Sequence, residues 1–387
     1  MSTQKFIKKV AMCALELTNL CNMNCGFCAY HLMKRPKGSM ELSLAKRLIK
    51  EVKDTGFCDT ITTNVMGEPL LYKEIFEVLR YATELRQKIT FLTNGEKLTD
   101  EVSSRLLEYP PVDIGISYHS HDEHSFRQRG ATISYEEYKR RVQGLIELKF
   151  KQKANVSISV NVITTQNMPH ERFSILETID AVNAFANEWI AFAKMLKRKY
   201  GLRWDIPRRI YPGGNLLLPG FFVVLYPVYH LWSNAIAPAG VKIVSVQKEV
   251  CFCAFKQFNV LWNGDVTICC IDYDGDLVYD SIQGKRIVDV FNSERIIALR
   301  KNFLRSEGLP PKCQACLGTA LGKGVAGCVM NKYPLSRLDR FRRLCRLGQR
   351  LLCSPKEIVP HMRAVLETKG IGKAMDKMYW DNFYHGA

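Results

Sequence analysis

The sequence predicts an α/β fold with a parallel sheet, curled or open. From residue 12 to about residue 193, short apolar runs alternate with longer segments in which apolar residues recur at helical spacing. Six predicted strands follow one another with five predicted helices between them, and strand–helix units in series form parallel sheets with right-handed crossovers. Sites in such folds lie at the carboxyl ends of the strands, so the residues that follow each strand are the first candidates for function.

Each predicted element rests on its own pattern. The strands are short runs rich in apolar and β-branched residues. In chain order they are residues 12–17, 60–65, 89–92, 112–117, 156–163 and 189–193. The helices between them repeat apolar residues at three- and four-residue steps. They are residues 43–55, 73–86, 99–107, 134–148 and 171–183.

A different pattern follows residue 193. Residues 194–209 are strongly basic, and residues 213–232 form an apolar stretch that Pro219, Gly220 and Pro227 interrupt. These interruptions leave no clean run of about 18 apolar residues, so a membrane span is a poor interpretation. We expect a buried linker under the mouth of the curled sheet, with monotopic contact to a membrane as the alternative.

A second unit is expected after this stretch. Apolar runs at 258–262 and 266–270 flank Asn263-Gly264, a dipeptide typical of a two-residue hairpin. Beyond the hairpin unit, the chain is predicted to end in a basic helical tail. The tail suits a membrane surface or a polyanion, or else a surface helix docked on the second unit. The predicted domains are 1–195, 196–240 (a basic and apolar insertion or linker), 241–328 and 329–387.

Charge and cysteine content narrow the class of protein. With 55 Lys and Arg against 38 Asp and Glu, the net charge of +17 favours anionic partners without choosing among them. The N-terminal residues lack the apolar core and the cleavage site of a signal peptide. Fourteen cysteines then indicate metal or redox chemistry in a reducing cytoplasm rather than disulfides. We therefore expect a cytoplasmic protein, with the basic tail as the part that would contact a membrane.

Three cysteines stand directly after the first predicted strand. Cys21, Cys25 and Cys28 have the spacing C-x3-C-x2-C. One loop of this kind can place three thiolates on three irons of a [4Fe–4S] cluster and leave the fourth iron open for chemistry. Zinc also accepts closely spaced thiolates, so the spacing alone leaves both metals open.

Motifs at the next strand ends resolve that choice. Phe27 precedes the last cysteine, Gly67-Glu68-Pro69 follows the second strand, and Thr93-Asn94-Gly95 follows the third. In this combination, residues 12 to about 316 resemble the radical S-adenosylmethionine (SAM) superfamily. The resemblance implies a partial (β/α)6 barrel in which the three cysteines bind a [4Fe–4S] cluster and SAM chelates its open iron. It also implies cofactor contacts from Phe27, Gly67, Glu68, Asn94, Ser117 and Arg129.

A second cysteine set follows in the hairpin unit. Cys251 and Cys269 flank the turn at Gly264, and Cys313-Gln-Ala-Cys316 comes later. This set resembles the auxiliary-cluster module of the SPASM and twitch subgroup of radical SAM enzymes, which implies one auxiliary [4Fe–4S] cluster bound by Cys251, Cys269, Cys313 and Cys316. Position 322 is Gly and the next cysteine is Cys328, so the twitch-like form with one auxiliary cluster fits better than full SPASM.

Two further cysteines lie near the second set. Cys253 is an alternative to Cys251, whose spacing from Gly264 matches the commoner form. Cys270 is expected to point to the opposite face of its strand from Cys269 and to be a packed thiol. The architecture is similar to that of the cyclitol dehydrogenase of aminoglycoside biosynthesis.

The leading hypothesis is a radical SAM oxidoreductase that cleaves SAM to a 5′-deoxyadenosyl radical and takes hydrogen from a substrate carbon. The resemblance implies oxidation of a sugar, cyclitol or similar anionic small molecule. It also implies an auxiliary cluster as electron relay and a low-potential donor such as flavodoxin or ferredoxin. His119, after the fourth strand, is a candidate base. Two alternatives stay open: a maturase of a ribosomally made peptide or protein, and a non-enzymatic, metal-stabilised protein that binds nucleic acid or membrane.

Overall fold

The computed structural model divides the chain into two compact units. One unit contains residues 1–228 and 252–298, and the other contains residues 229–251 and 299–387. The residues that the structure describes are 7–109, 111, 113–165, 172–211, 213–227, 232, 235–236, 241–242, 251–305, 307–317 and 329–330.

The first unit is built on one sheet with the strand order β11-β10-β9-β1-β2-β3-β4-β5-β7-β6. Its strands are β1 (Met12–Leu15), β2 (Thr60–Thr62), β3 (Lys88–Thr93), β4 (Asp113–Ser117), β5 (Ser157–Thr164), β6 (Gly213–Leu218), β7 (Phe221–Pro227), β9 (Gln257–Val260), β10 (Asp265–Thr267) and β11 (Val278–Ser281). Strands β1 to β5 and β7 run parallel to one another, and β6 pairs antiparallel with β7. The α/β fold with a parallel sheet is thus confirmed, and the described sheet is open, with β6 and β11 at its edges.

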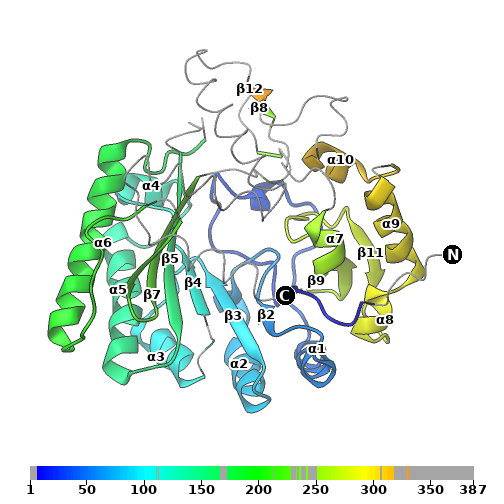
Figure 1. The fold of residues 1–387 in the computed structure, drawn as a ribbon, viewed down its shortest axis with the longest axis horizontal. Coiled ribbons are helices and arrows are strands. Elements are labelled where there is room, and N and C mark those ends of the chain that lie inside the picture. Colours follow the sequence, from blue (N-terminus) through cyan, green and yellow to red (C-terminus); the bar gives the residue numbers. More distant parts are fainter. Residues whose placement is uncertain are drawn as a thin grey trace, which may run out of the picture. The chain divides into compact units, whose positions relative to one another are not determined.

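Helices flank the parallel strands in the first unit (Figure 1). They are α1 (Leu42–Thr55), α2 (Ile75–Glu84), α3 (Asp100–Glu108), α4 (Glu123–Arg127), α5 (Tyr135–Gln152) and α6 (Ile179–Lys199), with a short 3-10 turn η1 (Ala29–Leu32) after the cysteine loop and another, η2 (Pro69–Leu71), after β2. Each predicted helix before residue 150 is confirmed to within a few residues. Thr99 and Ser134 cap α3 and α5, because their side chains accept backbone N–H groups of the first turn.

Two predictions after residue 165 are wrong. Residues 189–193, expected as a strand, lie inside α6, where Trp189, Ile190 and Ala193 continue a buried face with helical spacing. A short apolar run cannot be distinguished from a buried helix segment by its periodicity alone. The expected buried linker is also wrong over 213–227, which forms the β6–β7 hairpin and provides the sixth parallel strand. Gly220, with a φ of +69°, makes the turn between the two strands.

The predicted hairpin of the second cysteine set is confirmed and belongs to the same sheet. β9 pairs antiparallel with β10 and parallel with β1. The first unit also contains α7 (Phe252–Lys256) and α8 (Ile287–Phe291). β10 ends at Thr267, so the argument from strand alternation that separated Cys270 from Cys269 does not apply.

In the second unit, β8 (Val241–Lys242) pairs antiparallel with β12 (Val329–Met330). Helix α10 (Pro311–Leu317) also belongs to it, and α9 (Glu294–Arg305) extends into it from the first unit. The rest of the predicted basic tail, residues 331–387, lies outside the described residues.

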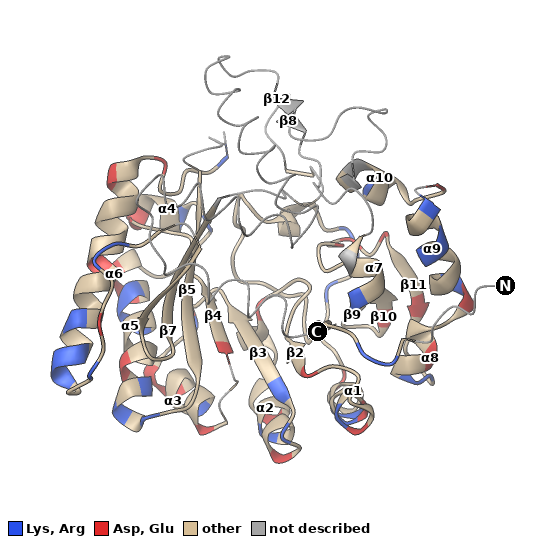
Figure 2. Cartoon of the chain, in the orientation of Figure 1, with Lys and Arg blue, Asp and Glu red and all other residues tan. Residues whose placement is uncertain are grey.

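Part of the basic stretch after residue 193 belongs to a helix end. Lys197, Arg198 and Lys199 lie in the last turn of α6, and Figure 2 colours this end of the helix blue for basic residues. Cations are favourable there because the carboxyl end of a helix carries partial negative charge. None of the helices that the structure describes has the length and apolar character needed to cross a bilayer.

Candidate functional site

The cysteine loop lies at the carboxyl edge of the parallel strands, directly after β1. Cys28 N donates to Cys25 O at 2.9 Å, and Cys21 N donates to Tyr30 Oη at 3.1 Å. Cys25 is buried, whereas Cys21 and Cys28 are half-buried. Hydrogen bonds within the loop and to η1 therefore order the segment that carries the three thiols at the end of β1.

The loop after β2 packs against the chain that leads into the cysteine loop. Gly67 has a φ of +89°, and a Cβ there would lie 2.2 Å from Thr18 O, so only glycine fits. The next residue, Glu68, donates its N–H to Leu20 O at 2.7 Å. This contact brings the Gly67-Glu68 backbone beside Cys21.

The buried carboxylate of Glu68 holds the end of β3. It accepts hydrogen bonds from Thr93 Oγ1 at 2.7 Å, Asn94 N at 2.6 Å and Leu70 N at 3.1 Å. Burial raises the pKa of Glu68 to about 6, although these hydrogen bonds oppose the shift. Because its amide, its carboxylate and its carbonyl, which accepts from Leu71 N, all have partners, Glu68 orients the neighbouring loops with its own polar groups.

Asn94 bridges β3 and the cysteine loop. Its Nδ2 donates to Asn22 Oδ1 at 2.9 Å and lies 3.9 Å from Cys21 Sγ, and its Oδ1 accepts from Glu96 N at 3.0 Å. The structure thus brings Asn94 into the predicted site, where its amide contacts a cysteine sulfur.

Arg129 is buried next to the same loop. Its Nε donates to Cys25 Sγ at 3.4 Å, while Nη1 and Nη2 donate to Tyr118 O and Ser117 O at 2.5 and 2.8 Å. Nη1 also contacts Ser120 Oγ at 3.4 Å. Tyr138 is a further hydrogen-bond partner of the guanidinium. Several partners therefore fix the Arg129 side chain against the cysteine loop.

His119 and Phe27 meet beside Arg129. Their rings lie edge to face with centroids 5.0 Å apart. His119 Nδ1 accepts a hydrogen bond from Ile163 N at 3.1 Å, and burial, followed by the Arg129 charge, lowers the pKa of His119 well below its ordinary value. The neutral ring then carries its proton on Nε2. That proton makes His119 a hydrogen-bond donor, which argues against its predicted part as a base.

The thiols of the loop suit a positively charged iron centre. Burial raises the pKa of Cys21 to about 11 and that of Cys28 to about 12, so both are neutral at pH 7 unless a metal displaces their protons. N–H groups of Asn94 and Arg129 already lie against two of the sulfurs. In the described part of the chain, no three His, Cys, Asp or Glu side chains converge on one ion. A cubane cluster needs no such point, since each thiolate binds its own iron.

The second cysteine set is divided between the two units. In the first unit, the Cys269 thiol contacts the thiol of Cys253, the alternative ligand, and that of Cys270, which the sequence predicts to be a packed thiol. Cys313 and Cys316 lie in α10 of the second unit, one helical turn apart.

Sequence comparison identifies both cysteine regions. Residues 15–174 match the model of the radical SAM superfamily, and residues 251–317 match that of SPASM, an iron–sulfur cluster-binding domain. The chain thus contains a radical SAM domain and a SPASM domain. Radical SAM domains imply a [4Fe–4S] cluster and SAM, and a SPASM domain implies auxiliary iron–sulfur binding, which confirms the cofactors expected from the two cysteine motifs.

Individual radical SAM relatives are similar over part of the chain. Mycofactocin maturase MftC of Mycobacterium tuberculosis is 32% identical over 154 residues, which are 40% of this chain and 38% of that protein. The S-adenosyl-L-methionine-dependent 2-deoxy-scyllo-inosamine dehydrogenase of Niallia circulans is 29% identical over 123 residues, 31% of this chain and 49% of that protein. A crystal structure of BtrN in complex with AdoMet and 2-DOIA aligns with 18% identity and a TM-score of 0.45, covering 80% of this chain and 92% of that one. The chain thus spans less than half the length of these curated relatives.

Sequence reasoning missed two buried carboxylates beside the radical SAM cysteine loop. Glu96 accepts from Thr132 N and Oγ1 at 2.7 and 2.6 Å and from Asn22 Nδ2. Glu16, completely buried at the end of β1, pairs with Arg35. A charged residue that interrupts an apolar strand run was the available signal for Glu16.

Proposed function

We propose that this chain is a SAM-dependent dehydrogenase of a sugar, a cyclitol or a similar anionic small molecule. When bound, a reduced [4Fe–4S] cluster supplies the electron that splits SAM into methionine and a 5′-deoxyadenosyl radical able to take hydrogen from an unactivated carbon. Oxidation of a carbinol to a ketone is balanced in atoms and electrons. One hydrogen atom leaves in 5′-deoxyadenosine, the hydroxyl group loses its proton, and one electron passes to the protein. The auxiliary cluster is the proposed acceptor of that electron.

The observation that carries the proposal is the arrangement at the end of β1. Three thiols lie in one short loop, and N–H groups of Asn94 and Arg129 contact two of their sulfurs, in the region that matches the radical SAM model. We assign Cys21, Cys25 and Cys28 as ligands of the first cluster. N–H groups directed at cluster sulfurs stabilise their negative charge and tune the cluster.

The remaining contacts suggest how the chain would hold SAM. No described group donates to the carbonyl of Gly67, so we assign that carbonyl to the amino group of methionine. Phe27, whose ring lies between His119 and Phe173, is assigned to one side of the adenine. Arg129 and the hydroxyl of Ser117 are assigned to the carboxylate or the ribose.

Release of 5′-deoxyadenosine tests this assignment. Anaerobically reconstituted protein, given dithionite and SAM, is expected to release 5′-deoxyadenosine, and Cys25→Ala is expected to abolish the release. The matched control is Cys58→Ala, which removes a buried thiol bonded to Thr60 O, away from the cysteine loop. A reconstituted protein that holds zinc and no iron would refute the proposal.

For the auxiliary cluster we assign Cys269, Cys313, Cys316 and one of two further thiols. The spacing to Gly264 favours Cys251 as the fourth ligand, whereas the thiol contact with Cys269 favours Cys253. Iron content of Cys251→Ala and Cys253→Ala, each reconstituted beside the parent protein, decides between them. We expect a low-potential flavodoxin or ferredoxin as the electron donor.

A peptide or protein substrate is the second candidate. It is favoured by the similarity to a mycofactocin maturase, which covers 40% of this chain. If the substrate is a peptide, deuterium should pass from a carbon-deuterated peptide into 5′-deoxyadenosine. Transfer of deuterium from a carbon-deuterated cyclitol instead would support the dehydrogenase.

A further inference from the structure

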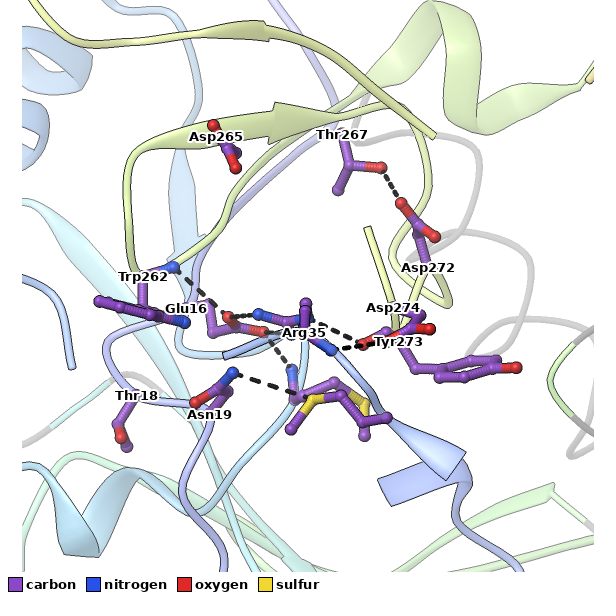
Figure 3. A network of polar contacts seen from close by, with 12 residues as sticks. Glu16, Thr18, Asn19, Arg35, Trp262, Asp265, Thr267, Asp272, Tyr273 and Asp274 are labelled. Atoms are coloured by element: carbon purple, nitrogen blue, oxygen red, sulfur yellow. Dashed lines mark hydrogen bonds and ion pairs between the residues drawn. The ribbon is translucent and has the colours of Figure 1, made fainter. Parts of the chain in front are cut away.

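A buried ion pair joins the cysteine loop to the end of β1. Glu16 is completely buried, and its two carboxylate oxygens accept from Arg35 Nη1 and Nη2 at 2.7 and 2.6 Å. Figure 3 shows this pair at the centre of a polar network. Such two-pronged pairing is the strongest form of Arg–carboxylate contact and fixes orientation as well as distance.

The Glu16 carboxylate also accepts hydrogen bonds from two other segments. Met66 N, in the loop before Gly67, donates to Oε2 at 2.9 Å, and Trp262 N, in the turn between β9 and β10, donates to Oε1 at 3.3 Å. A buried charge is costly unless it is paired and hydrogen-bonded. Glu16 meets that condition only while all of these segments are in place.

Arg35 and its neighbour hold the loop that carries Cys269. Arg35 Nε donates to Tyr273 O at 2.8 Å, and Asp274 Oδ1 accepts from Lys34 N and Arg35 N at 2.6 and 2.9 Å. The same loop is closed internally, because Asp272 N donates to Cys269 O at 3.2 Å. Asp272 also accepts from Thr267 Oγ1 at 2.7 Å and Leu277 N at 2.9 Å.

Trp262 adds a packing contact to these bonds. Its Nε1 donates to Pro36 O at 3.2 Å, and a Cβ at Gly38 would lie 2.5 Å from its ring. Gly38 N in turn donates to Asn19 Oδ1 at 2.8 Å. The hairpin turn is therefore seated on the return segment of the cysteine loop, where only glycine allows the approach.

We propose that Glu16, Arg35, Trp262 and Asp274 form an interloop clamp that positions the loop of Cys21, Cys25 and Cys28 against the loop of Cys269. The clamp makes the order of each loop depend on that of the other. Its consequence for electron transfer rests on the proposed function, since transfer between two clusters slows steeply as they separate. These four are positioning residues, because they act through the loops that carry the cysteines.

Amide hydrogen exchange of the full chain without clusters tests the clamp directly. Asp274→Ala removes a half-buried acceptor and is expected to accelerate exchange about tenfold at Gly38 N and Trp262 N, neither of which bonds to Asp274. Asp289→Ala, which breaks an exposed pair with Arg286, is the matched control and should leave both amides unchanged. Acceleration confined to Lys34 and Arg35, which lose their acceptor directly, would overturn the clamp.

A second variant tests the consequence for the clusters. Glu16→Gln with Arg35→Met removes both charges together, which avoids leaving one of them buried and unpaired. In reconstituted, reduced protein, the enhancement of electron-spin relaxation of one cluster by the other should weaken severalfold. Unchanged relaxation would refute the positioning role. Reconstituted protein without iron would overturn the proposed function instead, while the exchange experiment still decides the clamp.

Discussion

Glu68 and Glu96 are both almost completely buried beside the cysteine loop, yet their pKa values shift in opposite directions. For Glu68, burial outweighs the hydrogen bonds and raises the pKa to about 6. For Glu96, burial also opposes ionisation, but the hydrogen bonds from Thr132 outweigh it and lower the pKa. The partners of each carboxylate thus decide which one can take up a proton in mildly acidic solution.

The Glu68 shift predicts a pH dependence of stability. Between pH 4.5 and 6 the folded chain keeps a proton that the unfolded chain has lost, so the free energy of unfolding falls as the pH rises through this range. The loss over this range is about 2 kcal/mol. Urea unfolding of cluster-free protein across this range should show the loss in the parent chain and not in Glu68→Gln. The same slope in both proteins would contradict the prediction.

Arg129 is expected to set the reduction potential of the first cluster. A buried cation beside the Cys25 sulfur stabilises the more negative, reduced state. Arg129→Gln should therefore lower the midpoint potential by on the order of 100 mV, whereas Arg129→Lys should stay near the parent value. Redox titration followed by electron paramagnetic resonance measures it. Arg127→Gln, at an exposed ion pair with Glu123, is the control, and equal potentials in Arg129→Gln and the parent would exclude the effect.

At the scale of elements, the β6–β7 hairpin completes the set of parallel strands. β7 follows β5 residue by residue, and its side chains alternate, with Val223 buried and Val224 only half-buried. Trp189 and Phe192 of α6 cover Phe221 with ring centroids 6.0 and 6.2 Å from it. An apolar stretch that looked like a linker therefore forms one edge of the sheet and packs against α6.

Adjacent valines test this placement of β7. Val223→Ala should lower the free energy of unfolding by about 2 kcal/mol, because it leaves a cavity in the core. Val224→Ala, the same substitution one residue later, should cost less than half as much. Denaturant unfolding of the two variants measures the difference. Equal losses would mean that the strand does not have one face in the core.

At the scale of the whole molecule, cysteines from both units are assigned to the auxiliary cluster. Cys269 belongs to the first unit, and Cys313 and Cys316 belong to the second. Binding of the proposed cluster would contribute to folding, because a metal site rarely exists in an unfolded chain.

Loss of one auxiliary ligand should therefore leave the first cluster in place. We expect Cys316→Ala to retain about half of the iron of the reconstituted parent and still to release 5′-deoxyadenosine from SAM. Iron and sulfide analysis together with the cleavage assay checks both statements. Complete loss of iron in Cys316→Ala would show that the two clusters do not load independently.

The sequence by itself determined the order of strands and helices up to residue 165, the hairpin at Asn263-Gly264 and the two cysteine motifs. Each of these depends on the spacing of residues that are close in sequence, which does not depend on the tertiary structure. Only the tertiary structure decided the helical state of residues 189–193, the sheet position of 213–227 and the partners of Glu16, Arg129 and His119. Those outcomes depend on contacts between segments far apart in sequence. Glu16 and Arg35, for example, meet Trp262 and Asp274 only because β9 pairs with β1.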